Sequence, residues 1–432
     1  MEQPSDLYWL ALLEKSLSDK LPNDVVLEIL MRLPIKSVLR FKSVSKLWYS
    51  LLSHPNFARI HLKEAISGTH YLLFRHMVLE EKEGYVWRVH QGYSDSDIMI
   101  PAEDQEVGPD PSARRLVYQG KLWNERERFS LRSREDVEEL RRLRVPSPSS
   151  TSYYTLVGCF NGLVCLNESN FSDTYHTLDV SFWNPVTREL RSLPRYYTRN
   201  RRLSGSLLVV GIGFGYEPVT NDYKVVRLIY FNRSKSYDAE TYSIRRNSWK
   251  KISTENIHGC YFPQHVPQAT TNGALHWMVY KDRDYVSDSE FIIAFRLDQE
   301  TLSKISLPTI SPEDRVAHIC KRVSVFENKL ALFTHFPLAP DKKFTIWVMT
   351  EYGNAKSWTP LRAVRQEEFM VPLHFVGNNL VIMKRKKDGE MIVGDSEFKR
   401  IRDLNVSSWC RVADYFESLV SPKPWNARVR DI

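Results

Sequence analysis

The chain has 432 residues, of which 42% are hydrophobic and 12% aromatic, and its 60 Lys and Arg against 52 Asp and Glu give a formal net charge of +8. This apolar content is sufficient for a packed core and excludes a mostly disordered chain. The length exceeds that of one compact domain of about 100–200 residues, so we expect one large domain and one small domain.

The first residues carry no secretion signal, because residues 1–6 lack a basic region and the apolar stretch at 7–13 is far shorter than the about 20 residues that span a bilayer. We therefore expect a soluble protein, cytoplasmic and/or nuclear, without membrane contact. The five cysteines form no C-x-x-C pair, which argues against a disulfide framework and against a zinc ribbon. We expect reduced, mostly buried thiols and no metal or cofactor.

The first sixty residues have a helical pattern. Apolar residues at 25, 26, 29, 30 and 33 form one helical stripe, which Asn23 or Asp24 would cap and Pro34 would end. A second helix is predicted at residues 35–41 and a third at residues 44–52, before Ser53. So small a unit seldom folds alone without a metal, a disulfide or a partner, and a partner is the expectation here.

From about residue 70 the pattern changes to short apolar runs between polar turns, which predicts β-strands. Two phrases recur at intervals of roughly 50–60 residues, apart from a last interval of 40 in the second phrase, and they predict four-stranded blades in a propeller of the kelch type. A large antiparallel β-sandwich is the alternative. The first phrase is an Asn turn before an apolar strand, at Asn161, Asn221, Asn272, Asn328 and Asn379. The second is a polar turn before one large residue, at Leu190, Trp249, Leu302, Trp358 and Phe398.

These patterns predict a multidomain α plus all-β chain. Its parts are an N-terminal helical extension at 1–18, a small three-helix domain at 19–65 and a large antiparallel β domain at 70–420. A polar, charge-dense insertion interrupts the β domain at about 101–150. Within it, residues 133–140 could form a short helix, because Ser133 can cap the acidic residues that follow it.

The N-terminal residues resemble the F-box motif of plant F-box proteins over about residues 19–62. The resemblance lies in Leu21-Pro22, Asp24-Val25-Val26, Glu28-Ile29-Leu30, Arg32-Leu33-Pro34, Lys36-Ser37, Arg40-Phe41-Lys42, Val44-Ser45-Lys46 and Trp48. Downstream, Asn161-Gly162, Trp183-Asn184-Pro185, residues 213–216, residues 221–227 and His276-Trp277 resemble the F-box-associated domain of the same proteins. Glu217 departs from the Asp that is common there.

This resemblance implies a substrate-recognition subunit of an SCF-type (Skp1–cullin–F-box) ubiquitin ligase. The F-box would bind a Skp1-type adaptor and through it a cullin–RING ligase, and the β domain would bind a protein for ubiquitination. The subunit itself would not be an enzyme. The residues expected at the adaptor interface are Leu21, Pro22, Val26, Ile29, Leu30, Leu33, Pro34, Leu39 and Val44, whereas Trp48 and Leu51 are expected to pack internally. Some of the first group could equally form helical core.

A narrower interpretation is an S-locus F-box-like protein, which acts on a secreted and basic ribonuclease in pollen. It would need local acidic residues on a chain whose net charge is positive, and Asp282, Asp284, Asp288 and Glu290 are candidates. The sequence does not identify the substrate. A propeller enzyme or a module for sugars or small molecules, with an adaptor motif attached, is the alternative function.

Enzyme and nucleic-acid motifs are weak. Gly211, Gly213 and Gly215 have the wrong spacing for a nucleotide loop and precede a strand pattern, so close strand packing is the expected reason for them. His276 lies in an apolar strand, where a structural role is favoured. The basic run at 384–387 precedes Asp388-Gly389 and predicts a hairpin turn, with a nuclear signal as the alternative. We expect no nucleic-acid partner.

Overall fold

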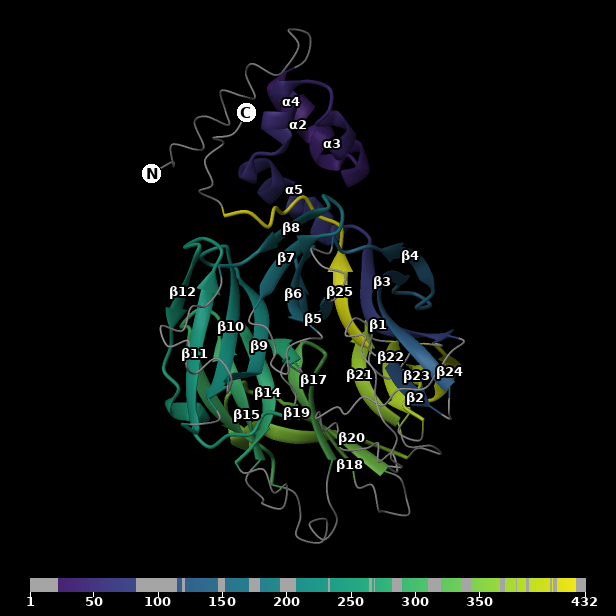
Figure 1. Cartoon of the computed structure of the whole chain (residues 1–432), viewed down its shortest axis with the longest axis vertical. Helices are drawn as coiled ribbons and strands as arrows, with labels where there is room; N and C mark the ends of the chain where they lie inside the picture. The colour runs from purple at the N-terminus through teal and green to yellow at the C-terminus, as the bar shows by residue number, and fades with distance from the viewer. Residues whose placement is uncertain are drawn as a thin grey trace.

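The computed structural model comprises a group of N-terminal helices and a ring of β-sheets (Figure 1). It describes residues 22–424 except 83–114, 119–120, 147–151, 171–178, 195–206, 282–289, 310–319, 336–342 and 366–369, and the shorter gaps 232–233, 264–265, 268, 378, 386–387, 405 and 407–409. The expected N-terminal extension, Leu21, Asp282, Asp284 and Asp288 therefore lie outside the described residues.

Four helices occur in the described N-terminal part: α2 (Asn23–Arg32), α3 (Ile35–Phe41), α4 (Lys46–Leu52) and α5 (Pro55–Ser67). The predicted bounds of α3 are confirmed. The predicted cap of α2 is wrong, because the helix already begins at Asn23 and Pro22 takes the cap position without a side-chain hydrogen bond. Helix α4 starts later than predicted, since Ser45 caps it by accepting a hydrogen bond from the Trp48 amide at 3.2 Å.

Six sheets follow, and the prediction of a propeller rather than a sandwich is confirmed. Five of them use four strands consecutive in sequence. The second blade has β5 (Ser152–Phe160), β6 (Leu163–Asn170), β7 (Val180–Asn184) and β8 (Glu189–Ser192). The third has β9 (Leu207–Glu217), β10 (Asp222–Phe231), β11 (Ser236–Ser243) and β12 (Ser248–Lys251).

The remaining three consecutive blades repeat this arrangement. The fourth has β13 (Ala269–Thr271), β14 (Ala274–Tyr280), β15 (Glu290–Arg296) and β16 (Thr301–Ser306). The fifth has β17 (Cys320–Phe326), β18 (Lys329–His335), β19 (Lys343–Met349) and β20 (Trp358–Arg365). The sixth has β21 (Met370–Val376), β22 (Leu380–Arg385), β23 (Met391–Asp395) and β24 (Arg400–Asp403).

The first blade joins the two ends of the β domain. It contains β1 (His70–Lys82), β2 (Arg115–Tyr118), β3 (Lys121–Ser133) and β4 (Glu139–Leu143), together with β25 (Arg411–Phe416) from the C-terminal end. Strand β25 pairs antiparallel with β1, from His70 opposite Phe416 to Arg75 opposite Arg411. The ring is therefore closed by hydrogen bonds between the first and last strands of the domain.

The charge-dense region at about 101–150 contributes three of these strands. Residues 133–140 do not form the predicted helix, since Ser133 ends β3, a turn follows and Glu139 begins β4. Pairing of β4 with β3 supplies the backbone partners that a helix would otherwise provide. Ser133, the predicted helix cap, instead stabilises the turn, because its Oγ accepts a hydrogen bond from the Glu135 amide at 3.0 Å.

Both recurring phrases mark tight turns on the same face of the ring. Asn161, Asn221, Asn272 and Asn328 join the first and second strands of their blades and have φ between 51° and 61°, a left-handed conformation that Asn tolerates. Arg188, Asn247 and Glu300 join third and fourth strands and have similar φ values. Because strands alternate in direction, all these turns lie on one face, and the connections between second and third strands and between blades begin and end on the opposite face.

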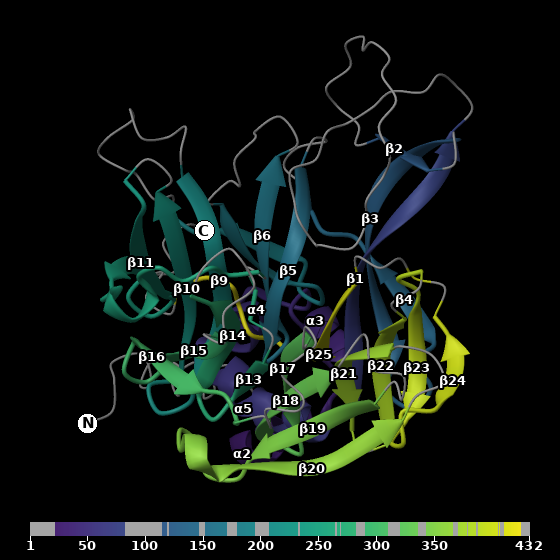
Figure 2. The same ribbon diagram turned by 90° about the horizontal axis from the view of Figure 1, so that it is seen from below.

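The inner side of the ring is formed by the first strand of each consecutive blade and by β25, as contacts of β25 with β5, β5 with β9, β13 with β17 and β17 with β21 show. In Figure 2 the sheets surround the centre of the ring, and the four helices lie behind them. The helices therefore occupy one face of the propeller, which is the face of the tight turns because Val186 in the β7–β8 turn packs against them.

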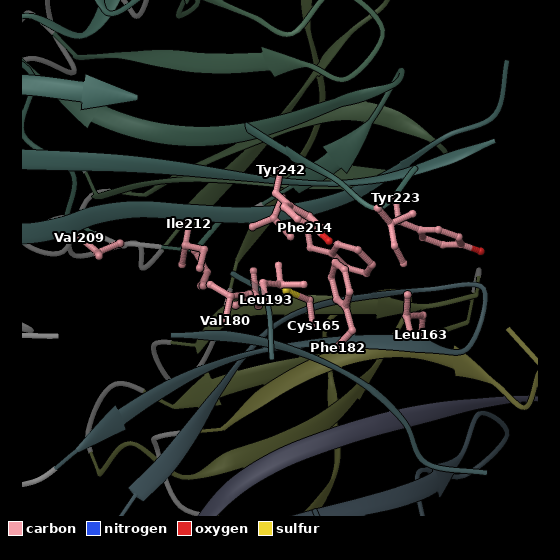
Figure 3. Packing of buried hydrophobic residues seen from close by; sticks show 14 of the residues in the cluster. Leu163, Cys165, Val180, Phe182, Leu193, Val209, Ile212, Phe214, Tyr223 and Tyr242 are labelled. Carbon is pink, nitrogen blue, oxygen red and sulfur yellow. The ribbon is translucent and has the colours of Figure 1, made fainter. Parts of the chain in front are cut away.

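Apolar side chains from neighbouring blades form the cores. Figure 3 shows the cluster between the second and third blades, in which Phe182 and Phe214 lie with ring centroids 5.3 Å apart and Cys165 is fully buried. Blades need this contact, since one twisted sheet cannot cover its own apolar face. Tyr223 and Tyr242 extend the cluster, and burial raises the pKa of both phenols.

Candidate adaptor-binding surface and the opposite face

The helices contain their own small core. Leu30, Met31, Ile35, Val38, Leu51, Leu52 and Phe57 are buried in it, and Leu419 from the C-terminal end of the chain completes the cluster. Leu51 is fully buried and Trp48 partly buried against this core, in agreement with the internal packing predicted for both. Trp48 also stacks on Phe41, with ring centroids 5.5 Å apart.

The structure separates the residues predicted at the adaptor interface into three groups. Leu30 is 2% exposed and belongs to the core, and Val26, Leu33 and Leu39 are partly buried against that core. Pro22, Ile29, Pro34 and Val44 are exposed. Their role at an interface stays a prediction, but only the exposed group is accessible in this conformation.

Sequence reasoning missed three exposed residues. Val25, Phe41 and Tyr49 are large apolar side chains of α2, α3 and α4 that are exposed together with Ile29 and Val44. We call these five residues the F-box apolar face. A signal for Val25 was present, since α2 has six apolar positions in ten residues and the small helical core cannot hold all of them. Single exposed apolar side chains are ordinary on soluble proteins, whereas several close together in one small domain indicate a contact surface.

Basic residues predominate on the helices that carry this face. Residues 22–67 contain seven Lys and Arg against three Asp and Glu, and Lys36, Arg40 and Lys46 are exposed on α3 and α4. Arg32 pairs with Glu28 on α2, with 2.6 Å between Nη2 and Oε1. The arrangement suits a partner surface that has an apolar centre and an acidic edge.

Four acidic residues were candidates for contact with a basic substrate, under the interpretation of an S-locus F-box-like protein. Of the four candidates only Glu290 is described, and it forms an ion pair with Lys321 of the next blade. Both side chains are largely buried. Glu290 therefore stabilises the contact between the fourth and fifth blades and is not available as a free acidic contact.

The basic run at 384–387 contains the turn that the sequence predicts. Arg385 ends β22 and its guanidinium holds the Asp388 carboxylate, with 2.9 Å from Nε to Oδ1 and 2.7 Å from Nη2 to Oδ2. Gly389 has φ of 75°, and its amide donates to the Arg385 carbonyl at 2.8 Å. Lys386 and Lys387 lie outside the described residues, so a nuclear signal there stays an expectation.

The glycines at 211, 213 and 215 serve packing, as predicted. They lie in β9, and a Cβ atom at Gly213 would be 2.7 Å from a Leu275 methyl group and 2.9 Å from the Trp277 ring of the next blade. At Gly215 it would be 2.6 Å from a Leu297 methyl group. Since β9 continues by a tight turn into β10 and no helix follows, this segment offers no helix N-terminus to a phosphate.

His276 is held by its surroundings. Its Nε2 lies 2.8 Å from the Tyr352 hydroxyl and its Nδ1 3.3 Å from the Ala269 carbonyl, and burial lowers its pKa to about 4. The ring is thus neutral at physiological pH and joins two blades. Burial raises the pKa of the Cys260 thiol to about 11, which leaves it unreactive.

Glu217, the departure from the family's usual Asp, stabilises the β9–β10 turn. Its carboxylate accepts hydrogen bonds from the Val219 and Thr220 amides at 2.7 and 2.8 Å. Burial favours the protonated form, but these bonds, the Thr220 hydroxyl and nearby Lys224 together hold the pKa of Glu217 below its ordinary value. The longer side chain therefore still satisfies the turn.

The described residues also show neither a metal-binding cluster nor a membrane-spanning helix. Among the described residues, His, Cys, Asp and Glu nowhere gather in a group of three or more that could bind a metal ion. In the same part of the chain, each helix is too short or too polar to cross a membrane.

Comparison with known proteins assigns both regions to families. Residues 18–60 match the F-box domain, and residues 117–404 match the F-box associated beta propeller domain. The F-box protein CPR1 of Arabidopsis thaliana is 23% identical over 412 residues, covering 89% of this chain and 84% of that protein. An F-box/kelch-repeat protein of the same plant is 24% identical over 416 residues, covering 93% and 96%.

Solved structures give more distant similarities. A prolyl endopeptidase aligns with a TM-score of 0.39 at 10% identity, over 68% of this chain and 42% of that one. The Dos1 propeller aligns with a TM-score of 0.31 at 11% identity, over 68% and 72%. The family match, which covers most of the chain, is the stronger result. The chain belongs to the plant F-box proteins that carry an F-box-associated β-propeller domain.

Proposed function

We propose that this protein is the substrate-recognition subunit of an SCF-type ubiquitin ligase. In this role the F-box binds a Skp1-type adaptor, and the propeller binds a protein that the assembled ligase ubiquitinates. The protein itself carries out no chemistry. The family membership supports a receptor role in general, and the F-box apolar face supports the adaptor contact.

The observation that carries the proposal is the position of that face. Ile29 is 49% and Val44 63% exposed, yet the same small domain buries Leu51 and Phe57 completely. Helices α2, α3 and α4 lie on the far side of α5 from the propeller in Figure 1, so a partner can reach them while the propeller stays accessible. An apolar patch with a basic edge fits an adaptor with an acidic surface, whose association rate should fall with salt.

The test is capture of purified Skp1-type adaptor by the full-length chain. Replacing Ile29 and Val44 by Asp places two charges in the proposed interface and should weaken binding by about 100-fold or more, because central apolar anchors carry most of the affinity. Val219→Asp is the matched control, since Val219 is 90% exposed on a propeller turn and should leave binding unchanged. Unchanged adaptor affinity in the double Asp variant, with an intact circular dichroism spectrum, would refute the assignment of this face.

A second measurement tests the receptor role. With the proteasome inhibited, intact protein and a variant lacking residues 22–67 are compared in affinity capture from plant cells. Proteins retained by both are candidate substrates, and ligase components should be lost with the F-box. Retention of cullin by the deletion variant would contradict the proposal.

A further inference from the structure

The last described residues of the chain lie between the F-box and the propeller. After β25, residues 417–424 run in an extended conformation across the face of the tight turns, below α5 and beside β7 and β8 (Figure 1). We call this segment the C-terminal strap. Ser418, Leu419 and Val420 are buried in it, although the strap contains no helix or strand.

Two neighbouring residues of the strap point into different cores. Leu419 is 5% exposed and packs with Leu30, Met31 and Phe57 in the core of the F-box. Val420 instead packs in the cluster between the second and third blades. Adjacent side chains of an extended segment point to opposite sides, so the strap is shared by both domains.

Asn184 fixes the strap to the second blade. Its Nδ2 donates to the carbonyls of Ser418 at 3.0 Å and Val420 at 2.8 Å, while its Oδ1 accepts from the amides of Val186 at 2.9 Å and Thr187 at 3.2 Å. The side chain is fully buried. The Asn184 amide thus binds the strap through its Nδ2 and stabilises the β7–β8 turn through its Oδ1.

Gly162 leaves room for the strap at the β5–β6 turn. A Cβ atom there would be 2.5 Å from the Ser418 Oγ and 2.7 Å from the Phe416 carbonyl oxygen, both closer than such atoms approach. The Ser418 hydroxyl donates to the Asn161 carbonyl. The strap therefore contacts two motifs of the second blade, Asn161-Gly162 and the sequence around Asn184.

Two charged residues of β8, Glu189 and Arg191, extend the contact with the strap. The Arg191 Nη1 donates to the Pro422 carbonyl at 3.0 Å. Glu189 accepts a hydrogen bond from the Ser421 hydroxyl at 3.2 Å and lies 3.7 Å from the Lys423 ammonium. It also attracts Lys42 of the F-box, whose pKa burial lowers and Glu189 partly restores.

We propose that the C-terminal strap holds the F-box in one orientation on the propeller, and that Leu419 is the strap residue that anchors the F-box by packing in its core. The strap then sets the direction in which the adaptor extends from the substrate-binding domain. This inference about orientation rests on the proposed receptor function, but the coupling itself is a property of the isolated chain and can be measured without any partner.

The first test uses two adjacent positions of the full-length protein. Leu419→Ala should speed amide hydrogen exchange in α2 and α5 by about tenfold or more, because it opens a cavity in the F-box core. Val420→Ala is the matched control and should speed exchange in the blades from β5 to β12 with little change in α2. Leu419→Val should give a smaller effect of the same kind. Equal protection of α2 and α5 in wild type and Leu419→Ala would overturn the proposal.

The second test measures orientation. Spin labels carried by noncanonical amino acids at Lys46 and Leu361, both exposed, report the distance between the F-box and the fifth blade. Asn184→Asp keeps the acceptor of the turn but loses both donors to the strap, so the distance distribution should broaden. Asn354→Asp is the control, since Asn354 caps a turn of the fifth blade through the Lys356 amide and does not touch the strap. An unbroadened distribution in Asn184→Asp would contradict the proposal.

These outcomes separate the strap from the receptor function. A variant with a loosened F-box that still binds adaptor supports both proposals, and it should ubiquitinate a captured substrate less efficiently. If the wild-type chain does not bind the adaptor, the proposed receptor function is refuted. The hydrogen-exchange and distance measurements would still test the coupling through the strap. An unchanged F-box in every strap variant would remove the coupling alone.

Discussion

The F-box and the propeller achieve stability in opposite ways. The propeller buries its apolar residues between six blades and closes the ring by pairing β25 with β1. The F-box has a core of seven residues from its own helices, completed by Leu419. Of ten large apolar side chains that are exposed among the described residues, six lie in the F-box although the propeller is several times larger.

This difference separates folding from binding. In the propeller, most large apolar side chains are buried between blades. The recurring sequence motifs of the propeller form its turns and the contacts between blades. In the F-box, several large apolar side chains are exposed to solvent, and the core is completed by Leu419 from the C-terminal strap. A domain of this size buries a smaller fraction of its surface than a large domain does, so each contact is a large part of its stability.

Matched truncations in the two cores test this comparison most strongly. Phe57→Ala in the F-box and Phe214→Ala in the propeller both remove a fully buried ring and should each cost about 3–5 kcal/mol. In the F-box that loss should unfold α2–α5, whereas the propeller should stay folded with a lower melting temperature. Circular dichroism at 222 nm and calorimetry distinguish the two outcomes. An F-box that survives Phe57→Ala would show that it is more stable than its core suggests.

The contact between the third and fourth blades should weaken at acidic pH. Burial raises the pKa of Glu300, but Arg246, Lys224 and Lys250, which lie 2.8, 3.1 and 3.1 Å from its carboxylate, outweigh burial and lower it to about 2. Since this pKa is below that of the unfolded chain, the stabilisation is complete above about pH 5 and is lost as the pH falls toward 2.

Glu300→Gln should therefore lower the free energy of unfolding by about 2–3 kcal/mol at pH 7, because it leaves the buried Lys224 without its carboxylate. The difference from wild type should shrink between pH 5 and pH 3 in urea titrations. Adaptor binding should not change, since the ion pairs of Glu300 are with residues of the third blade. A pH-independent difference would mean that packing, and not charge, accounts for the effect.

The smallest expected effect is at the cap of α4. Ser45→Ala removes the acceptor for the Trp48 amide and should cost about 1 kcal/mol of F-box stability. Ser45→Asp should retain the cap. Urea unfolding followed by Trp fluorescence measures both. An equal loss in the two variants would show that the hydroxyl contributes by something other than capping.

Local patterns predicted the elements that depend on neighbouring residues. Helix α3 and the Asn turns were recovered because their signals lie within a few positions of each element. Helix α5 was not predicted, since the last predicted helix ends before Ser53. Pro55 begins α5, and proline is favoured in the first turn of a helix. Residues 133–140 carried a helix signal that pairing with β3 overrode.

The exposed apolar residues of the F-box were predicted only in part, because periodicity does not say which side of a stripe faces solvent. The residues predicted at the interface include Leu30, which lies in the core, and omit Phe41 and Tyr49, which are exposed. The strap was not predicted at all. Asn184 and Ser418 are 234 positions apart, and no local pattern joins them. The family motif around Asn184 was visible, but its purpose depends on a contact that only the folded chain supplies.

The closing position of β25 has a consequence for synthesis. Domains generally fold as units while the ribosome extends the chain, and the F-box emerges first. Its missing core residue, Leu419, and the strand that closes the ring emerge only after strands β2 to β24. A chain released before them therefore carries an F-box without its full core and a propeller without its innermost first-blade strand. Packing of the F-box core is thus completed only after the rest of the propeller has been synthesised.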